Sequence, residues 1–153
     1  MPPNRLRLVA GELSVEIAPA VGGSVAAHDA RSALLGLQPD RRGWPWPYRA
    51  SQRFELEPDG MRVTLALQNL ADEPFPFSLG LHPYFPRPEG ALLQASCRRI
   101  RSSDGADFGS PRAVAAATLD HCFDGWLGQA TVLWPADGLA LTLHAEGCGS
   151  PGG

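Results

Sequence analysis

The sequence is poor in charge and in cysteine. Only 19% of its 153 residues are charged, and 16 acidic against 13 basic residues leave a net charge of -3. A nucleic-acid-binding domain typically shows a basic excess, so we expect no nucleic-acid partner. The cysteines are few and far apart, which excludes a disulfide framework and the close pairs of a zinc site. We therefore predict no metal site and three ordinary thiols, at Cys97, Cys122 and Cys148.

Long apolar runs are also missing. No stretch of the sequence is apolar over the length that a bilayer-spanning helix needs. The start of the chain, Met1-Pro2-Pro3-Asn4-Arg5, lacks the apolar core of a signal peptide. These absences predict a cytoplasmic protein without a membrane partner.

Helix signals are few, whereas turn formers are common. The chain contains 17 glycines and 15 prolines beside 44% hydrophobic residues, a composition typical of a turn-rich β protein with its own core. The length suits one domain. We predict a single β domain over residues 1–146 and a disordered Gly/Ser/Pro tail over 147–153.

Alternation of apolar and polar residues predicts antiparallel strands along the chain. The clearest hairpin joins residues 53–57 to 61–68 through Pro58-Asp59-Gly60, and another joins 131–134 to 139–143 through Pro135–Gly138. Further strands are expected at 6–8, at 13–17, after Gly23 and at 92–97. Residues 34–47 are expected to form no regular element, residues 98–111 a polar loop, and residues 113–118 either a short helix or a strand.

One histidine lies in a conformationally restricted segment, residues 78–87. Pro83 and Pro86 fix their own φ angles and push the residues before them, including His82, out of the α region. Tyr84 and Phe85 supply apolar anchors beside the imidazole. An ionisable ring held in this way suits acid–base chemistry near neutral pH. The alternative is that His82 is a packed loop histidine with a satisfied hydrogen bond.

A second polar–aromatic cluster lies at residues 119–126. Carboxylates such as Asp120 can bind the hydroxyl edges of a sugar, while Tyr84 or Trp126 can cover its apolar face. A sugar pocket built from this cluster and the His82 segment is one interpretation, and chance pairing in a loop-rich β protein is the other. A glycosidase is disfavoured, because Asp120 and Asp124 lie on one short stretch and are not expected to flank a substrate.

Three more aromatic residues follow one another closely in a proline-rich run. Trp44, Trp46 and Tyr48 alternate with Pro45 and Pro47. Their rings could present flat faces to a ligand or close the end of a sandwich. We favour the second role for at least two of them.

Four runs together resemble the aldose 1-epimerase (mutarotase) family: GELSVEIAPAVGGSV at 11–25, WPYRASQRF at 46–54, LGLHPYFPRP at 79–88 and LDHCFDGW at 119–126. The resemblance implies an antiparallel β-sandwich of the galactose mutarotase type, incomplete here. It also implies interconversion of the α and β anomers of an aldose without a metal or redox cofactor. In this reading His82 protonates the ring oxygen and Asp120 binds the sugar, with Tyr84 and Trp126 beside it.

The sequence also departs from the family pattern. A dozen residues, 32–43, replace a longer family segment that carries a second histidine and a substrate-binding arginine, and neither His28 nor Arg41 or Arg42 matches those motifs. The family's general base is a glutamate near the C-terminus in a Glu-Pro context, which Glu146 does not match. We therefore expect a shortened or fragmentary member that by itself is weakly stable and nearly inactive.

Two alternatives to the aldose 1-epimerase interpretation are kept. One is a carbohydrate-binding module without turnover, which would use the same sugar-binding residues. The other is a mutarotase for hexose 6-phosphates, which would need a basic cluster at the pocket mouth; the candidates are Arg87, Arg98 and Arg99.

Overall fold

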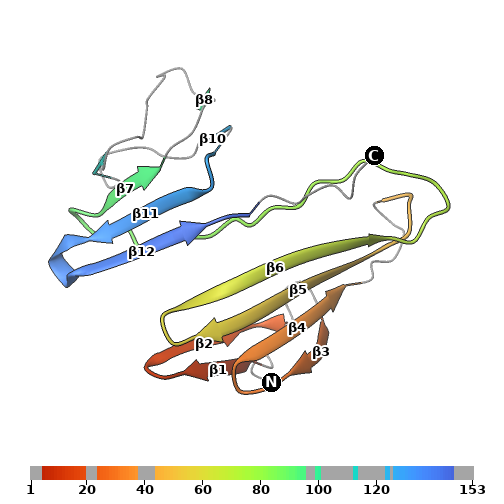
Figure 1. The fold of residues 1–153 in the computed structure, drawn as a ribbon, viewed down its shortest axis with the longest axis horizontal. Helices are drawn as coiled ribbons and strands as arrows, with labels where there is room; N and C mark the ends of the chain where they lie inside the picture. Colours follow the sequence, from red (N-terminus) through yellow and green to blue (C-terminus); the bar gives the residue numbers. More distant parts are fainter. Residues whose placement is uncertain are drawn as a thin grey trace. The chain divides into compact units, whose positions relative to one another are not determined.

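The structure is a computed structural model that describes residues 5–19, 24–37, 44–95, 99–100, 112–113, 123–124 and 126–146. Within these ranges the regular structure consists of antiparallel β-strands and a short 3-10 turn, and no α-helix occurs. The predicted all-β, antiparallel fold class is thus confirmed. The chain divides into two compact units, Met1–His82 and Pro83–Gly153, which are described separately (Figure 1).

The first unit holds a two-stranded ribbon and a four-stranded sheet. The ribbon pairs β1 (Leu6–Ala10) with β2 (Leu13–Ile17) through a tight turn at Gly11, whose φ of 62° favours glycine. The sheet has the order β3-β4-β5-β6. Its strands are β3 (Ser24–His28), β4 (Ser32–Leu37), β5 (Tyr48–Glu57) and β6 (Gly60–Asn69). The long β5–β6 hairpin closes at Pro58-Asp59, as predicted.

The expectation of no regular element over residues 34–47 is wrong for its first part. Residues 32–37 form β4, an internal strand that pairs with β3 on one side and β5 on the other. Its Ala33 and Leu35 are buried, and Leu34 on the opposite face is half-buried. An internal strand does not need the alternation that marks a half-solvated one. Residues 44–47 carry no strand, as expected.

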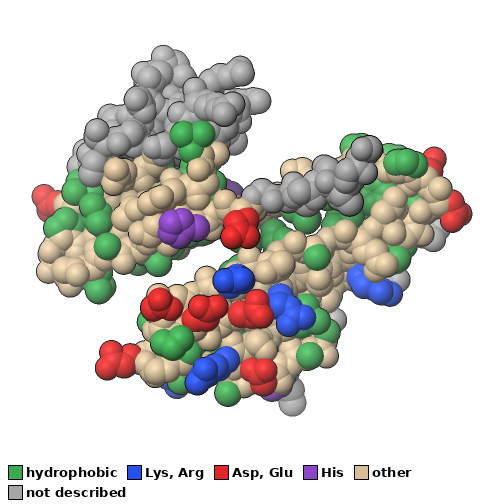
Figure 2. All heavy atoms as spheres, viewed as in Figure 1, with side chains coloured by type: hydrophobic (Ala, Val, Ile, Leu, Met, Phe, Trp, Pro, Cys, Tyr) green, Lys and Arg blue, Asp and Glu red, His purple; other side chains and the backbone are tan. Residues whose placement is uncertain are grey.

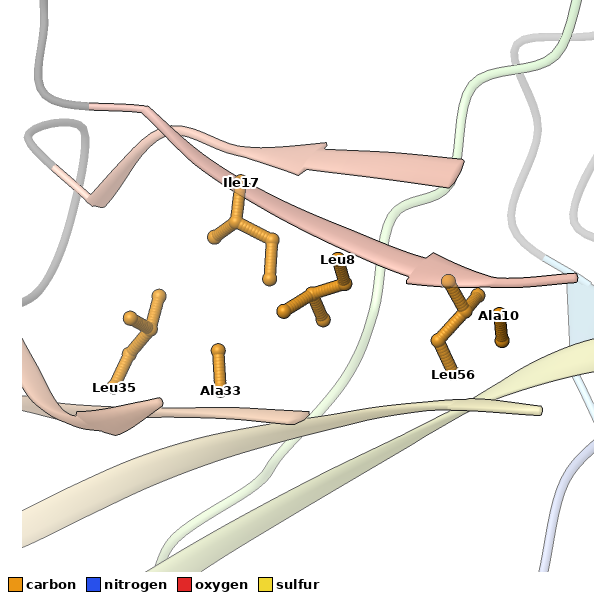
Figure 3. Close-up of a cluster of buried hydrophobic side chains, with 6 residues drawn as sticks. All are labelled: Leu8, Ala10, Ile17, Ala33, Leu35 and Leu56. Atoms are coloured by element: carbon orange, nitrogen blue, oxygen red, sulfur yellow. The ribbon is translucent and has the colours of Figure 1, made fainter. Parts of the chain in front are cut away.

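The core of the first unit lies between the ribbon and the sheet (Figure 3). Leu8 is fully buried, and Ile17 from β2 is 6% exposed. Both face apolar side chains of the sheet, Ala33 and Leu35 on β4 and Leu56 on β5. Two sheets packed face to face are the local form of the predicted sandwich.

The turn between β3 and β4 connects the two layers. The Asp29 carboxylate accepts hydrogen bonds from the backbone N–H groups of Arg31 and Ser32, both at 2.7 Å, and from the Ser32 hydroxyl at 2.9 Å. The carbonyl of Ala30 accepts from Val9 N in β1, and that of Arg31 accepts from Leu56 N in β5, each at 2.8 Å. The turn is thereby hydrogen-bonded to both the ribbon and the sheet.

In the view of Figure 2, both acidic and basic side chains lie on the surface of the first unit. Two pairs illustrate this, Arg5 with Glu16 at 2.7 Å and Arg62 with Glu57 at 4.0 Å. All four side chains are more than half exposed, so each pair contributes little to stability.

The second unit is built on the four-stranded order β12-β11-β7-β9. The predicted C-terminal hairpin is confirmed as β11 (Gln129–Trp134) and β12 (Leu139–His144), joined by the 3-10 turn η2 (Pro135–Asp137) and Gly138. The predicted strand at 92–97 is described as β7 (Leu92–Ala95). Arg112–Ala113 forms β9 beside it.

A small pair of strands completes the second unit. Arg99–Ile100 is β8 and pairs with β10 (Phe123–Asp124), so the predicted loop at 98–111 contains a strand at its start. The short β8 escapes prediction because two residues carry no periodicity. Residues 101–111, 114–118, Asp120 and the predicted disordered tail lie outside the described residues, as do the cysteines. The single domain over 1–146 stays a prediction.

In the part of the chain that the structure describes, no helix is long and apolar enough to cross a membrane.

Replacing the buried Leu8 tests the core of the first unit. We expect Leu8→Ala to lower the free energy of unfolding by about 2–5 kcal/mol, because truncation of a buried leucine leaves a cavity. Urea unfolding followed by tryptophan fluorescence measures this. Val9→Ala is the control, since Val9 on the same strand is 44% exposed. A loss from Leu8→Ala no larger than that from Val9→Ala would contradict the core position.

The hydrogen bonds to Asp29 make the turn sensitive to acid. They lower the pKa of the Asp29 carboxyl below its ordinary value of 3.8, the backbone N–H of Arg31 contributing most. A lowered pKa stabilises the folded state above the unfolded pKa, and this contribution disappears as the pH falls through the folded pKa. We expect Asp29→Ala to have a lower melting temperature than the parent at pH 6. This difference in melting temperature should narrow below about pH 4. Glu12→Gln, in the β1–β2 turn, is the control. An equal difference in melting temperature between Asp29→Ala and the parent at pH 6 and at pH 2.5 would contradict this prediction.

Candidate functional site

His82 lies in the long segment of the chain that follows β6 and precedes β7. Residues 70–91, between β6 and β7, contain no helix or strand. This irregular segment leads to an exposed His82 at the end of the first unit. Because no ladder of backbone hydrogen bonds holds this segment, its side chains and turns must position the imidazole.

The first turn of the segment is closed by Asn69. Its side-chain Nδ2 donates to the carbonyl of Glu73 at 2.8 Å, and its Oδ1 accepts from Ala71 N at 2.8 Å. The next residue, Leu70, donates its N–H to Pro47 O at 3.0 Å and so continues the β5–β6 pairing by one step. An Asn that bonds its own backbone two residues on is a common way to close a turn.

An aromatic cluster packs against this turn. Trp46 Nε1 donates to Glu73 Oε1 at 2.7 Å, and its ring stacks on Phe75 with centroids 5.6 Å apart and planes 14° apart. Trp44 meets both rings edge-on, at 5.5 Å from Trp46 and 6.2 Å from Phe75. Phe75 is 8% exposed. Trp44 and Trp46 thus pack within the first unit, and Trp44 remains 39% exposed.

The second unit anchors the residues after His82. Trp134 Nε1 donates to Pro86 O at 3.0 Å, and the Trp134 ring meets Phe85 edge-on at 6.5 Å. Phe85 is half-buried, whereas the Tyr84 side chain is 85% exposed. Phe85 therefore provides one of the two apolar anchors expected in this run. The expectation is wrong for Tyr84, whose side chain is largely exposed to solvent.

The remaining predicted residues belong to the second unit. Trp126 precedes β11, is 39% exposed and donates its indole N–H to Gln129 O at 2.8 Å. Asp120, the predicted sugar-binding carboxylate, lies outside the described residues. His82 and Tyr84 are separated only by Pro83, and the structure does not place Trp126 relative to His82. Among the described residues, no three His, Cys, Asp or Glu side chains form a group that could hold a metal ion.

Two anchoring residues were not predicted from the sequence. Glu73 lies in the irregular segment after β6, and Trp134 lies at the end of a predicted strand. The chemistry of tryptophan indicates that such hydrogen bonds should exist, because an indole N–H removed from water needs an acceptor. The sequence does not indicate which acceptor is used.

The features described so far are an antiparallel β fold and an exposed histidine in a Pro-restricted, tryptophan-anchored segment. They agree with a match of residues 24–148 to the family model of aldose 1-epimerase. The chain belongs to the aldose 1-epimerase family.

A similar sequence and a similar solved structure both come from Escherichia coli K12. One is the uncharacterized protein YphB, 30% identical over 126 residues, which cover 72% of this chain and 43% of YphB. The other is a crystal structure of a protein provisionally assigned as an aldose 1-epimerase, with a TM-score of 0.69 and 28% identity over 78% of this chain and 45% of that one. The chain thus spans less than half the length of the relatives it matches.

The Trp46–Glu73 hydrogen bond can be tested by removing its donor. We expect Trp46→Phe to keep the stack on Phe75 but to lower the free energy of unfolding by about 1 kcal/mol, because the Glu73 carboxylate loses a partner. Amide exchange in residues 70–77 should accelerate. Trp44→Phe is the matched control in the same cluster. Equal exchange in both variants would contradict the anchoring role of Trp46.

Proposed function

We propose that this chain carries the acid and sugar-binding part of an aldose 1-epimerase site. The observation that supports the proposal is the His82 segment, whose sequence resembles the family's histidine motif and which lies within residues 24–148, the range that matches the family model. In this proposal His82 is the ring-oxygen acid. Asp120 binds sugar hydroxyls, and the exposed rings of Tyr84 and Trp126 cover the apolar face of the sugar.

The proposed reaction requires two coordinated proton transfers. The imidazolium of His82 gives its proton to the ring oxygen while a base removes the proton from the anomeric hydroxyl. The bond between C1 and the ring oxygen breaks and C1 becomes a carbonyl. Rotation about the C1–C2 bond and the reverse transfers then close the ring on the other face, which returns the proton to His82. Histidine suits this role because its side chain titrates near neutral pH.

The base of the pair has no counterpart that we assign in this sequence. Glu146 lies in a Gly-Cys-Gly-Ser-Pro context instead of the family's Glu-Pro context. We therefore propose that the 153-residue chain by itself catalyses anomerisation only slightly above buffer. This same feature favours a second candidate function, a carbohydrate-binding module without turnover.

Polarimetry of freshly dissolved α-D-glucose or α-D-galactose, with and without formate, tests the proposed acid. Formate can act as a diffusible substitute for the missing base, so the rate above a matched protein-free solution should rise. His82→Gln should lower this protein-dependent rate by about 10²–10⁴-fold, which is the usual contribution of a positioned acid. His28→Gln is the control, because His28 is an exposed histidine on β3 outside the family motif.

Sugar titration of the tryptophan fluorescence separates the two candidates. Saturable binding that is lost in Asp120→Asn, together with a formate-dependent rate that requires His82, supports the epimerase site. Binding without any protein-dependent rate favours the binding module. A chain that shows neither binding nor rate has no sugar site, and both functions would be wrong.

A further inference from the structure

Among the described strands, β12 is an edge strand of the second unit's sheet. In the order β12-β11-β7-β9, β12 is the terminal strand and has a neighbour on one side among the described strands. Its residues pair with β11 in a regular antiparallel register, from Gln129 opposite His144 to Trp134 opposite Leu139. A terminal strand presents unpaired N–H and C=O groups along its outer side.

The register shows which residues of β12 point outward. Ala145 N donates to Gly128 O at 2.9 Å, so this opposed pair is a hydrogen-bonded one. Hydrogen-bonded pairs alternate along an antiparallel ladder, so residues 143, 141 and 139 of β12 also direct their backbone groups to β11. The backbone groups of the intervening residues, Ala140, Thr142 and His144, therefore face the open edge.

On one face of this sheet, Val132 of β11 is buried, whereas Leu139 and Leu141 of β12 are exposed. Val132 is opposite Leu141 and Trp134 is opposite Leu139, so these four side chains lie on one face. Val132 is 6% exposed, whereas Leu141 is 38% and Leu139 61% exposed. Figure 2 shows hydrophobic side chains at the surface of the second unit, where the β11–β12 hairpin lies.

β12 also lacks the features by which edge strands usually avoid pairing. Proteins protect edges with charges, prolines, bulges or very short strands. At the edges of the first unit's sheet, β3 is bulged between Val25 and Ala27, and β6 carries Arg62 beside Glu57. β9, at the other end of the β12 sheet, is described over two residues. β12 has six residues, LALTLH, with no proline and no Lys, Arg, Asp or Glu.

We propose that β12 pairs antiparallel with β12 of a second copy of this chain, about a two-fold axis at Thr142. In this register Ala140 faces His144 of the second copy, Thr142 faces Thr142, and all three outward residues form hydrogen-bonded pairs. A register centred on Leu141 would pair only Ala140 and Thr142. A second copy fits because the strand is self-complementary: it brings no like charge opposite itself, and the isologous contact closes at two chains.

The same register continues the apolar face across the two copies. Leu141 of one copy lies opposite Leu143 of the other, and Leu139 lies opposite Ala145. The exposed leucines of each chain thereby gain apolar neighbours, which supplies a hydrophobic contribution beside the backbone hydrogen bonds. A six-residue edge is smaller than a standard interface, so we expect a dissociation constant on the order of 1–100 μM.

Sedimentation velocity of the full chain from about 1 to 300 μM tests the proposal; the range covers the expected dissociation constant. The mass should rise from 16.3 kDa to twice that value. Ala140→Pro removes an outward N–H in both copies and should raise the dissociation constant at least tenfold, as for the loss of two ordinary hydrogen bonds. Ala140→Ser keeps the N–H and should dimerise like the parent. Leu139→Lys, which leaves the backbone unchanged, should also weaken the dimer.

A matched proline on β6, an edge strand of the first unit's sheet, tests whether the dimer depends on β12 in particular. Leu70 N donates to Pro47 O, so by the same alternation Met61 directs its N–H away from β5. Met61→Pro should leave the dimer intact. Three results would each overturn the proposal. The first is a chain that stays monomeric over the whole concentration range, and the second is open-ended association without a dimer. The third is a dimer that is lost in Met61→Pro but kept in both Ala140→Pro and Leu139→Lys. Circular dichroism confirms that the compared variants keep their strands.

Discussion

The packing of the β1–β2 ribbon on the apolar face of the four-stranded sheet is the interaction on which the first unit depends. Its buried side chains are few, and two of them are alanines. A core this small has little apolar surface to lose, so a single leucine such as Leu8 accounts for a large share of it. The β3–β4 turn supports this packing because its carbonyls accept hydrogen bonds from both layers.

Tryptophan holds the segment that contains His82. The segment has no backbone ladder, and each unit anchors its own part of it: Trp46 bonds Glu73 in the first unit, and Trp134 bonds Pro86 in the second. Both indoles combine an apolar ring that packs on a phenylalanine with an N–H that requires an acceptor. Proline restricts the backbone between these anchors. Together these contacts explain how an irregular segment can present an exposed imidazole.

The sequence predicted the strands that carry a periodic pattern and a turn signal, and it failed elsewhere. The β5–β6 hairpin follows from strict alternation on both sides of Pro58-Asp59-Gly60. β4 was missed because an internal strand of leucines shows no alternation, and β8 because it is too short to show any. For the site, the sequence identified His82, Tyr84 and Trp126 as candidates. It could not predict that Phe85 is anchored while its neighbour Tyr84 is exposed, because that depends on Trp134, far along the chain.

The sequence by itself determined the all-β class, both long hairpins and the membership in the aldose 1-epimerase family, because local periodicity, turn residues and motifs encode them. Only the tertiary structure decided which strands are internal and which lie at an edge. It also decided which acceptors the tryptophans use and which leucines of β12 are exposed. The physical reason is that these properties arise from pairing between residues distant in sequence, and a strand carries the same alternation whether or not a neighbour lies beside it.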